Sequence, residues 1–218
     1  HLREFVAQLP PGTTNEKVIV SNHTLYPYYC PFLPKERAEQ IYASLLSSVD
    51  GRGLHFRIGI VASGVLMPSY LRYCANCIND DEIQYGEPYW HRLHQLPGVL
   101  ICPKHGQILS TSDVFFSSVR GKHKYVLLQD ALRQQTMKPD IRIEQCFDKL
   151  KGIADYSQFL LENELHPIGL ESIRSMYISR LSSKGMATAK GRVRFSKVLP
   201  RFVSFFGHEL LDLLGEKL

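Results

Sequence analysis

Four residues of the types that zinc prefers are arranged in two pairs of matched spacing. Cys74 and Cys77 are separated by two residues, and Cys102 and His105 repeat this spacing after a gap of 24 residues. One tight turn lets both members of such a pair reach a single ion, and zinc takes four sulfur or nitrogen ligands at the corners of a tetrahedron. The spacing therefore predicts one Zn²⁺ ion held by these four side chains.

The composition of this ligand set also predicts what the ion does. Three thiolates and one imidazole fill all four positions of a tetrahedral zinc ion, which leaves none for water or a substrate. We therefore expect a structural zinc that contributes folding energy, and a chelator should destabilise the fold.

Other interpretations of the same residues stay open at the level of sequence. Cys74 and Cys77 would also be close enough for a disulfide, although the chain offers no sign of an oxidising compartment and no βαβ context for a redox pair. His91 or His94 could replace His105 as the fourth ligand. We rank both lower because neither is part of a zinc knuckle and because histidines on a partly apolar helix are more often packed or solvent-facing.

The residues between the two pairs need structure of their own. Pro88 to Leu96 predicts a short helix that places Trp90, Leu93 and Leu96 on one apolar side. The Ser and Thr cluster at residues 110–113 predicts a boundary after this zinc-finger module.

The rest of the chain predicts helices joined by irregular segments. Residues 1–32 are broken by prolines and are expected to be irregular, whereas a helix should begin after Pro34 and stop at Asp50-Gly51. His55 to Ala62 could form a short strand or a helical turn. Further helices are expected within residues 145–164, from Leu170 to a stop at Gly185, from a Ser196 cap to Gly207 with Pro200 near the first turn, and over residues 209–214.

These elements predict a mainly α fold, in which a structural zinc-finger module is combined with a helical, helix-turn-helix-like region. We expect three parts: an N-terminal connector and helix over residues 1–70, the zinc-finger module over 71–125, and a helical domain over 126–218. The chain has 218 residues, of which 44% are hydrophobic, so it can bury a core. Cys30 and Cys146 are expected to be small buried hydrophobes.

The sequence also predicts how the chain begins and where in the cell it is found. The chain begins with His1 instead of Met, so we expect a piece of a longer protein. No apolar run approaches the roughly 20 residues of a membrane span, which predicts a protein without a membrane segment. We expect a cytoplasmic location in a bacterial cell, in association with the nucleoid.

Positive charge is concentrated near the C-terminal end of the chain. From Ser172 to His208 there are eight Lys or Arg residues and no Asp or Glu, whereas the other 18 basic and 21 acidic residues sum to a net charge of −3. A surface of one sign is expected of a protein that faces phosphates. We expect contacts to double-stranded DNA from this segment and from a second basic spot, that is, from Lys190, Arg192, Arg194, Lys197, Arg201, Lys122 and Lys124.

Three stretches carry a resemblance to a known family: HTLYPYYCPFLPKERAEQI, then YCANC with YGEPYWHRLHQLPGVLICPKHGQIL, and then GMATAKGRVRFSKVLPRFVSFFGHELLDLLG. Together they resemble the TniQ/TnsD family of target-selection proteins from bacterial transposons, from about Asn22 to Gly215, most specifically in the zinc portion. The resemblance implies zinc ligation by Cys74, Cys77, Cys102 and His105. It also implies a non-enzymatic protein that recognises an attachment site and recruits an AAA+ ATPase regulator of transposition.

Two functions of other classes compete with this interpretation. One is a protein adaptor of the TniQ type, which links the ATPase to a separate targeting complex and reads little DNA sequence itself. The other is a metal-dependent nuclease that uses Asp80, Asp81 and Glu82. These carboxylates lack histidines at ligand spacing, so we expect no enzymatic activity.

Overall fold

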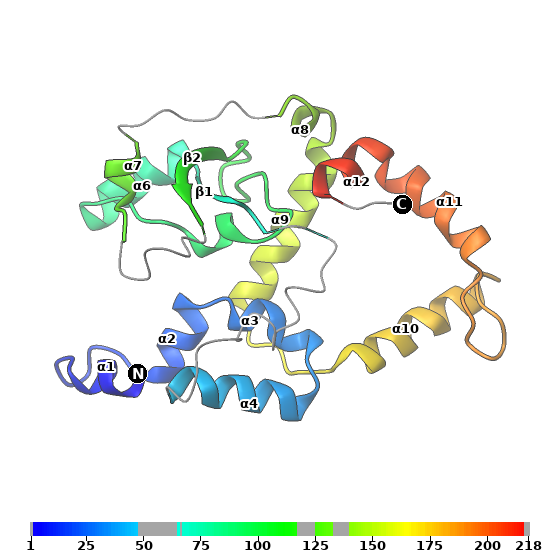
Figure 1. The fold of residues 1–218 in the computed structure, drawn as a ribbon, viewed down its shortest axis with the longest axis horizontal. Coiled ribbons are helices and arrows are strands. Elements are labelled where there is room, and N and C mark those ends of the chain that lie inside the picture. The colour runs from blue at the N-terminus through cyan, green and yellow to red at the C-terminus, as the bar shows by residue number, and fades with distance from the viewer. Residues whose placement is uncertain (1, 48–64, 66, 117–124, 133–139, 216–218) are drawn as a thin grey trace. The chain divides into compact units, whose positions relative to one another are not determined.

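The computed structural model describes residues 2–47, 65, 67–116, 125–132 and 140–215, and helices make up most of them (Figure 1). The mainly α fold expected from the sequence is therefore confirmed. The described residues pack into two compact units. The first contains the residues up to 47 together with Leu160–Gly207, and the second contains those from Val65 to Phe159 together with the final helix.

The first unit begins with short helices where the sequence predicted irregular structure. They are α1 (Leu2–Ala7), α2 (Glu16–His23), α3 (Tyr26–Tyr29) and the 3₁₀ helix η1 (Cys30–Phe32). The prediction is wrong because Pro27 and Pro31 each occupy the second position of a helix, where the missing N–H has no partner to lose. Asn15 adds a cap, since its side chain accepts a hydrogen bond of 3.0 Å from the N–H of Val18.

The helix α4 (Lys35–Leu46) supplies the core of the first unit, and it begins after Pro34 as predicted. Its residues Ala38 and Ile41 pack with Cys30 and Leu33 in one buried cluster. Cys30 therefore acts as the small buried hydrophobe that the sequence predicted. The stop expected at Asp50-Gly51 and the element expected over His55 to Ala62 lie outside the residues described.

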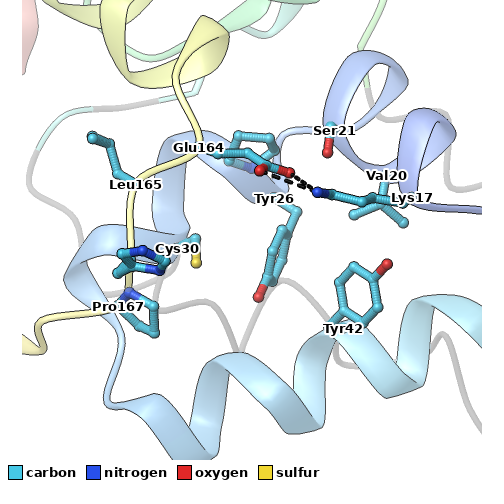
Figure 2. Close-up of a pocket in the computed structure, with 11 residues that line it drawn as sticks. Lys17, Val20, Ser21, Tyr26, Cys30, Tyr42, Glu164, Leu165 and Pro167 are labelled. Atoms are coloured by element: carbon cyan, nitrogen blue, oxygen red, sulfur yellow. Dashed lines mark hydrogen bonds and ion pairs between the residues drawn. The ribbon is translucent and has the colours of Figure 1, made fainter.

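A pocket opens in this unit between α2, α3, α4 and the segment that follows the long helix α9 (Phe147–Glu162) (Figure 2). Its volume is about 280 Å³. Tyr26 and Tyr42 meet edge to face inside it, with ring centroids 5.7 Å apart. At its rim Lys17 forms an ion pair of 2.8 Å with Glu164, which joins α2 to the segment after α9. This exposed ion pair connects two parts of the unit that are far apart in the sequence.

Two further helices of the first unit follow, α10 (Leu170–Ser183) and α11 (Phe195–Phe206). Gly185 and Gly207 lie just beyond their ends as predicted, with φ of 67° and 83°. Arg194, and not Ser196, is the cap residue of α11, and Pro200 is the sixth residue of the helix, beyond its first turn. Both of these details were predicted wrongly, because the helix begins two residues earlier than a Ser196 cap would place it.

The connection between α10 and α11 is a small hairpin. Ala187 and Val193 form an antiparallel bridge, and the N–H of Thr188 donates to the carbonyl of Arg192 at 2.9 Å. The connection runs over residues 184–194, so it is longer than the three or four residues of a usual helix-turn-helix turn. Helix, hairpin and helix place basic side chains at the tip and along α11.

The second unit contains a two-stranded antiparallel sheet of β1 (Tyr70–Tyr73) and β2 (Ser110–Phe115), in which Arg72 pairs with Thr111. The boundary predicted at residues 110–113 is wrong, because these residues form β2. The hydroxyl of Ser112 donates to the carbonyl of Leu71 at 2.8 Å, so a Ser-rich segment that resembles a linker is held in the sheet.

Between the strands lie α6 (Ala75–Tyr85) and the 3₁₀ helix η3 (Arg92–Gln95). The helix predicted over Pro88 to Leu96 is thus reduced to one short turn. Trp90 precedes this turn and donates from its indole nitrogen to the carbonyl of Val126 at 2.8 Å. That bond and the packing of Trp90 on Tyr73 and Leu128 fix the segment without a full helix.

The remaining helices of the second unit are α7 (Leu128–Ala131), α8 (Arg142–Gln145), most of α9, and α12 (His208–Leu214). Leu128, Leu150 and Leu210 are fully buried and form part of its core. Cys146 is buried, as predicted. In the described parts of the chain, no helix is long and apolar enough to cross a membrane.

Two glycines of this unit should respond oppositely to alanine. Gly152 lies inside α9 with open space around it, so Gly152→Ala should stabilise the protein by about 0.5–1 kcal/mol. Gly98 has a φ of 73°, and an added Cβ would lie 3.4 Å from Leu214, so Gly98→Ala should destabilise it by about 1 kcal/mol or more. Urea unfolding of both variants measures this, and a stabilising Gly98→Ala would contradict the backbone assigned there.

Candidate metal centre

The first pair of cysteines lies where β1 passes into α6. Cys74 is the cap residue at the start of α6, and Cys77 lies in the first turn of that helix. The N–H of Ile78 donates to the carbonyl of Cys74 at 3.2 Å, so the helix begins directly at the first cysteine. This junction directs both sulfurs to one side of the backbone, and both cysteines are buried.

The second pair lies in a tight turn closed by backbone hydrogen bonds. Ile101 and Ile108 form an antiparallel bridge, and the N–H of Cys102 donates to the carbonyl of Gln107 at 2.8 Å. The N–H of Gly106 donates back to the carbonyl of Cys102 at 2.8 Å, and Gly106 adopts a φ of 62° that favours glycine. The turn brings the sulfur of Cys102 and the imidazole of His105 together.

The four side chains meet at distances that suit a tetrahedral ion. Nδ1 of His105 lies 3.5 Å from the sulfur of Cys74, 3.3 Å from that of Cys77 and 3.6 Å from that of Cys102. The sulfurs of Cys77 and Cys102 are 3.7 Å apart. Zinc bonds of about 2.3 Å to sulfur and about 2.0–2.1 Å to nitrogen give tetrahedral edges of about 3.8 Å and about 3.6 Å. The residues therefore fit a single ion that lies among them.

The thiols also change one another's pKa values. Hydrogen bonds from the neighbouring thiols of Cys102 and Cys77 hold the pKa of Cys74 far below the ordinary thiol value, because they stabilise its thiolate. Hydrogen bonds with Cys102 and Cys74 raise the pKa of the Cys77 thiol above its ordinary value. A divalent cation would bind all three sulfurs as thiolates, since thiols that bind a metal are deprotonated. The cysteines are free thiols, so the disulfide interpretation of Cys74 and Cys77 is wrong.

A carboxylate behind His105 completes the arrangement. Nε2 of His105 donates to Asp80 at 3.0 Å, which leaves Nδ1 with its lone pair toward the sulfurs. Lys104 forms an ion pair with Asp80. The hydrogen bond from the Lys104 ammonium group holds the pKa of that carboxyl below its usual value. Carboxylates in this position orient a ligating imidazole and raise its basicity. Asp80 lies one helical turn after Cys77, but no sequence pattern indicated this role for it.

Loss of this carboxylate should weaken metal binding without removing a ligand. Asp80→Asn should lower the affinity for Zn²⁺ by about 10–100-fold, because the amide orients the imidazole less strongly. Competition with a coloured chelator measures the change. Asp155→Asn is the matched control, since Asp155 also pairs with a lysine, Lys151, but lies in α9. Equal affinities for Asp80→Asn and the wild type would show that Asp80 does not support His105.

His91 and His94 do not join the set that contains His105. His94 is buried, and its Nε2 lies 4.0 Å from the sulfur of Cys77. Burial lowers the pKa of His94 to about 3, so its imidazole is neutral. Nε2 of His91 lies 2.8 Å from Asp81, whose carboxylate accepts its hydrogen bond. Cys77, His91 and His94 form a second group, with ligand atoms all within 4.8 Å of one another.

The basic residues singled out in the sequence lie on the hairpin and on α11. The five are all exposed, and Lys190 and Arg192 lie at the tip of the hairpin while Arg194 caps α11. Lys197 and Arg201 follow at a spacing of four, which places them on one side of the helix. The Nη1 atom of Arg194 donates to the carbonyl of Gly185 at 3.4 Å, which steadies the base of the hairpin. Lys122 and Lys124 lie outside the described residues.

Fold and site define the class of this protein: a mainly helical protein with a buried centre of three cysteines and one histidine that could hold a metal ion. Residues 2–109 match the TniQ family. Over 204 residues the chain is 30% identical to the transposon Tn7 transposition protein TnsD of Escherichia coli, and the match covers 92% of this chain and 38% of that protein. The chain is a TniQ/TnsD-like protein. It spans well under half the length of the curated relative that it matches.

Proposed function

We propose that this chain is the part of a Tn7-type target selector that binds double-stranded DNA at an attachment site and recruits an AAA+ ATPase regulator. The observation that carries the proposal is the exposed basic segment, in which Lys190, Arg192, Arg194, Lys197 and Arg201 have no nearby acidic residue in the sequence. The likeness to a Tn7 transposition protein supports it. The proposed role is recognition without a catalytic step.

The hairpin and α11 carry side chains of the types that contact DNA. Lysine and arginine neutralise phosphates and position a protein on the duplex, and arginine at the tip of an element can read base edges in the major groove. Arg192 lies at such a tip, whereas Lys197 and Arg201 lie along the helix. We expect all three side chains to contact phosphates, and Arg192 to contribute to sequence reading as well.

We also propose that the ion at the Cys3His centre is Zn²⁺ and that it is structural. Thiolates favour soft or borderline metals, and four nitrogen or sulfur ligands in a tetrahedron are typical of zinc. Cys74, Cys77 and Cys102 would bind through sulfur and His105 through Nδ1. The ion would tie the start of α6 to the turn at residues 102–105 and so stabilise the second unit.

A binding selection tests the DNA proposal. The purified chain is mixed, at near-physiological salt, with random duplexes and fragments of the host chromosome, and the bound DNA is sequenced. Enrichment of one site over many rounds is the expected result. Equal recovery of all duplexes would exclude sequence reading by this chain.

The apolar side of α11 supports a second candidate, the adaptor that joins an ATPase to another targeting complex. Phe195, Leu199 and Phe202 are 73%, 44% and 41% exposed on this helix. Large exposed apolar side chains at helical spacing are typical of a surface that binds protein. If the adaptor function holds, Leu199→Ser with Phe202→Ser should abolish capture of the purified ATPase while DNA affinity stays unchanged. Loss of DNA binding alone would favour the selector.

A further inference from the structure

His94 has an unusual environment for a histidine in a protein core. It is 2% exposed, and its Nδ1 is buried without a hydrogen-bond partner among the described residues. Its other ring nitrogen faces the sulfur of Cys77 at 4.0 Å, which is at the outer limit of a hydrogen bond to sulfur. The nitrogen that faces Cys77 thus has only a weak partner, and a metal ion bound there would be a stronger one, whereas Nδ1 would keep its proton and gain no partner from that ion.

His91 is oriented as metal-binding histidines are. Its Nε2 lies 2.8 Å from the carboxylate of Asp81, and Asp81 is itself buried. A carboxylate that accepts from one ring nitrogen fixes the tautomer and leaves the lone pair of the other nitrogen free for a metal. The same relation holds between Asp80 and His105 in the Cys3His centre.

The two imidazoles and the sulfur of Cys77 are also close enough to share one ion. Their ligand atoms lie within 4.8 Å of one another, and the ring centroids of His91 and His94 are 4.9 Å apart. Two imidazoles bound to a tetrahedral ion at about 2.0–2.1 Å place their ring centroids about 5 Å apart. The observed separation therefore matches that of a pair of ligands.

Charge favours a second cation at this position. With one divalent ion bound, the three thiolates and the Asp81 carboxylate carry four negative charges against two positive ones. The buried guanidinium of Arg72, whose charge acts on His94, adds one positive charge. One net negative charge thus remains, which attracts a cation to this position without fully balancing a divalent one.

We propose that Cys77, His91 and His94 bind a second zinc-like divalent cation, with the sulfur of Cys77 shared between this ion and the Cys3His centre. A thiolate has enough lone pairs to bind two cations at once. The three protein ligands leave a fourth position for water, on the side where the His91 side chain is 25% exposed. This ion is expected to exchange more readily than the one in the Cys3His centre.

Metal stoichiometry tests the proposal. The zinc-loaded protein is titrated with Co²⁺ and examined by native mass spectrometry and absorption spectroscopy. We expect two ions per chain, one zinc and one cobalt, with a sulfur-to-cobalt charge-transfer band from Cys77. A wild-type protein that holds one ion at every Co²⁺ concentration would overturn the proposal.

Variants separate this site from weak binding elsewhere. His91→Ala should hold one ion and lose the charge-transfer band, and it is preferred to His94→Ala because His91 is partly exposed and less important to the core. His23→Ala, which removes an exposed histidine of α2, is the matched control and should hold two ions. A second ion that survives in His91→Ala would place it outside this cluster and overturn the assignment.

Discussion

Removal of the metal with a strong chelator should unfold the second unit. A structural zinc ion contributes about 10–16 kcal/mol to the folding of a small zinc domain, whereas a whole domain is stable by only about 5–15 kcal/mol. The expected loss is thus as large as the stability that it supports. Because Cys74 caps α6 and Cys102 lies beside the core residue Ile101, loss of the ion should release both elements.

Circular dichroism and thermal melting, with and without chelator, measure this effect. Cys102→Ser should reproduce the chelated state, because a hydroxyl replaces a thiolate ligand. Cys146→Ser is the control, since Cys146 is also a buried free cysteine but lies outside the cluster. It should melt as a single, modestly destabilised protein that still responds to chelator. An unchanged melting temperature after complete removal of the metal would rule out a structural role for the ion.

The grouping of the Cys3His side chains could be predicted from sequence because it depends on short spacing. Each pair, Cys74 with Cys77 and Cys102 with His105, is fixed by one local turn, so only the meeting of the two turns depends on tertiary structure. The carboxylates that pair with the histidines could not be predicted in the same way. Asp80 reaches His105 across 25 residues, and the pairing of Asp81 with His91 depends on where the chain after α6 returns.

The fold was predictable where helices are long and amphipathic. The segment after Pro34 forms α4, and the last fifty residues form α10, α11 and α12, because apolar residues recur there at helical spacing. Short elements were missed because local signals conflict in them. Prolines of residues 1–32 suggested breaks yet begin helical turns, and the Ser and Thr residues of β2 suggested a linker yet pair with a strand.

The strongest expected effect on DNA concerns the hairpin and the start of α11. Replacing Arg192, Arg194 and Lys197 together with alanine should reduce the slope of log affinity against log salt by about 2.7, since each phosphate contact contributes about 0.9. At physiological salt this corresponds to an affinity about 100-fold weaker. Fluorescence anisotropy with a labelled duplex, repeated across a range of salt concentrations, gives both quantities.

A control of equal charge separates local contacts from the general attraction of a basic protein to DNA. Arg3, Lys35 and Arg37 are exposed on α1 and α4, so their replacement by alanine removes the same three charges from elsewhere in the first unit. Long-range attraction depends on net charge and would weaken equally in both variants, whereas counterion release occurs only where side chains meet phosphates. A smaller salt slope in the hairpin variant alone would therefore locate the interface on the hairpin and α11. Equal slopes in the two variants would remove this segment from the interface and leave its exposed apolar residues as the feature to explain.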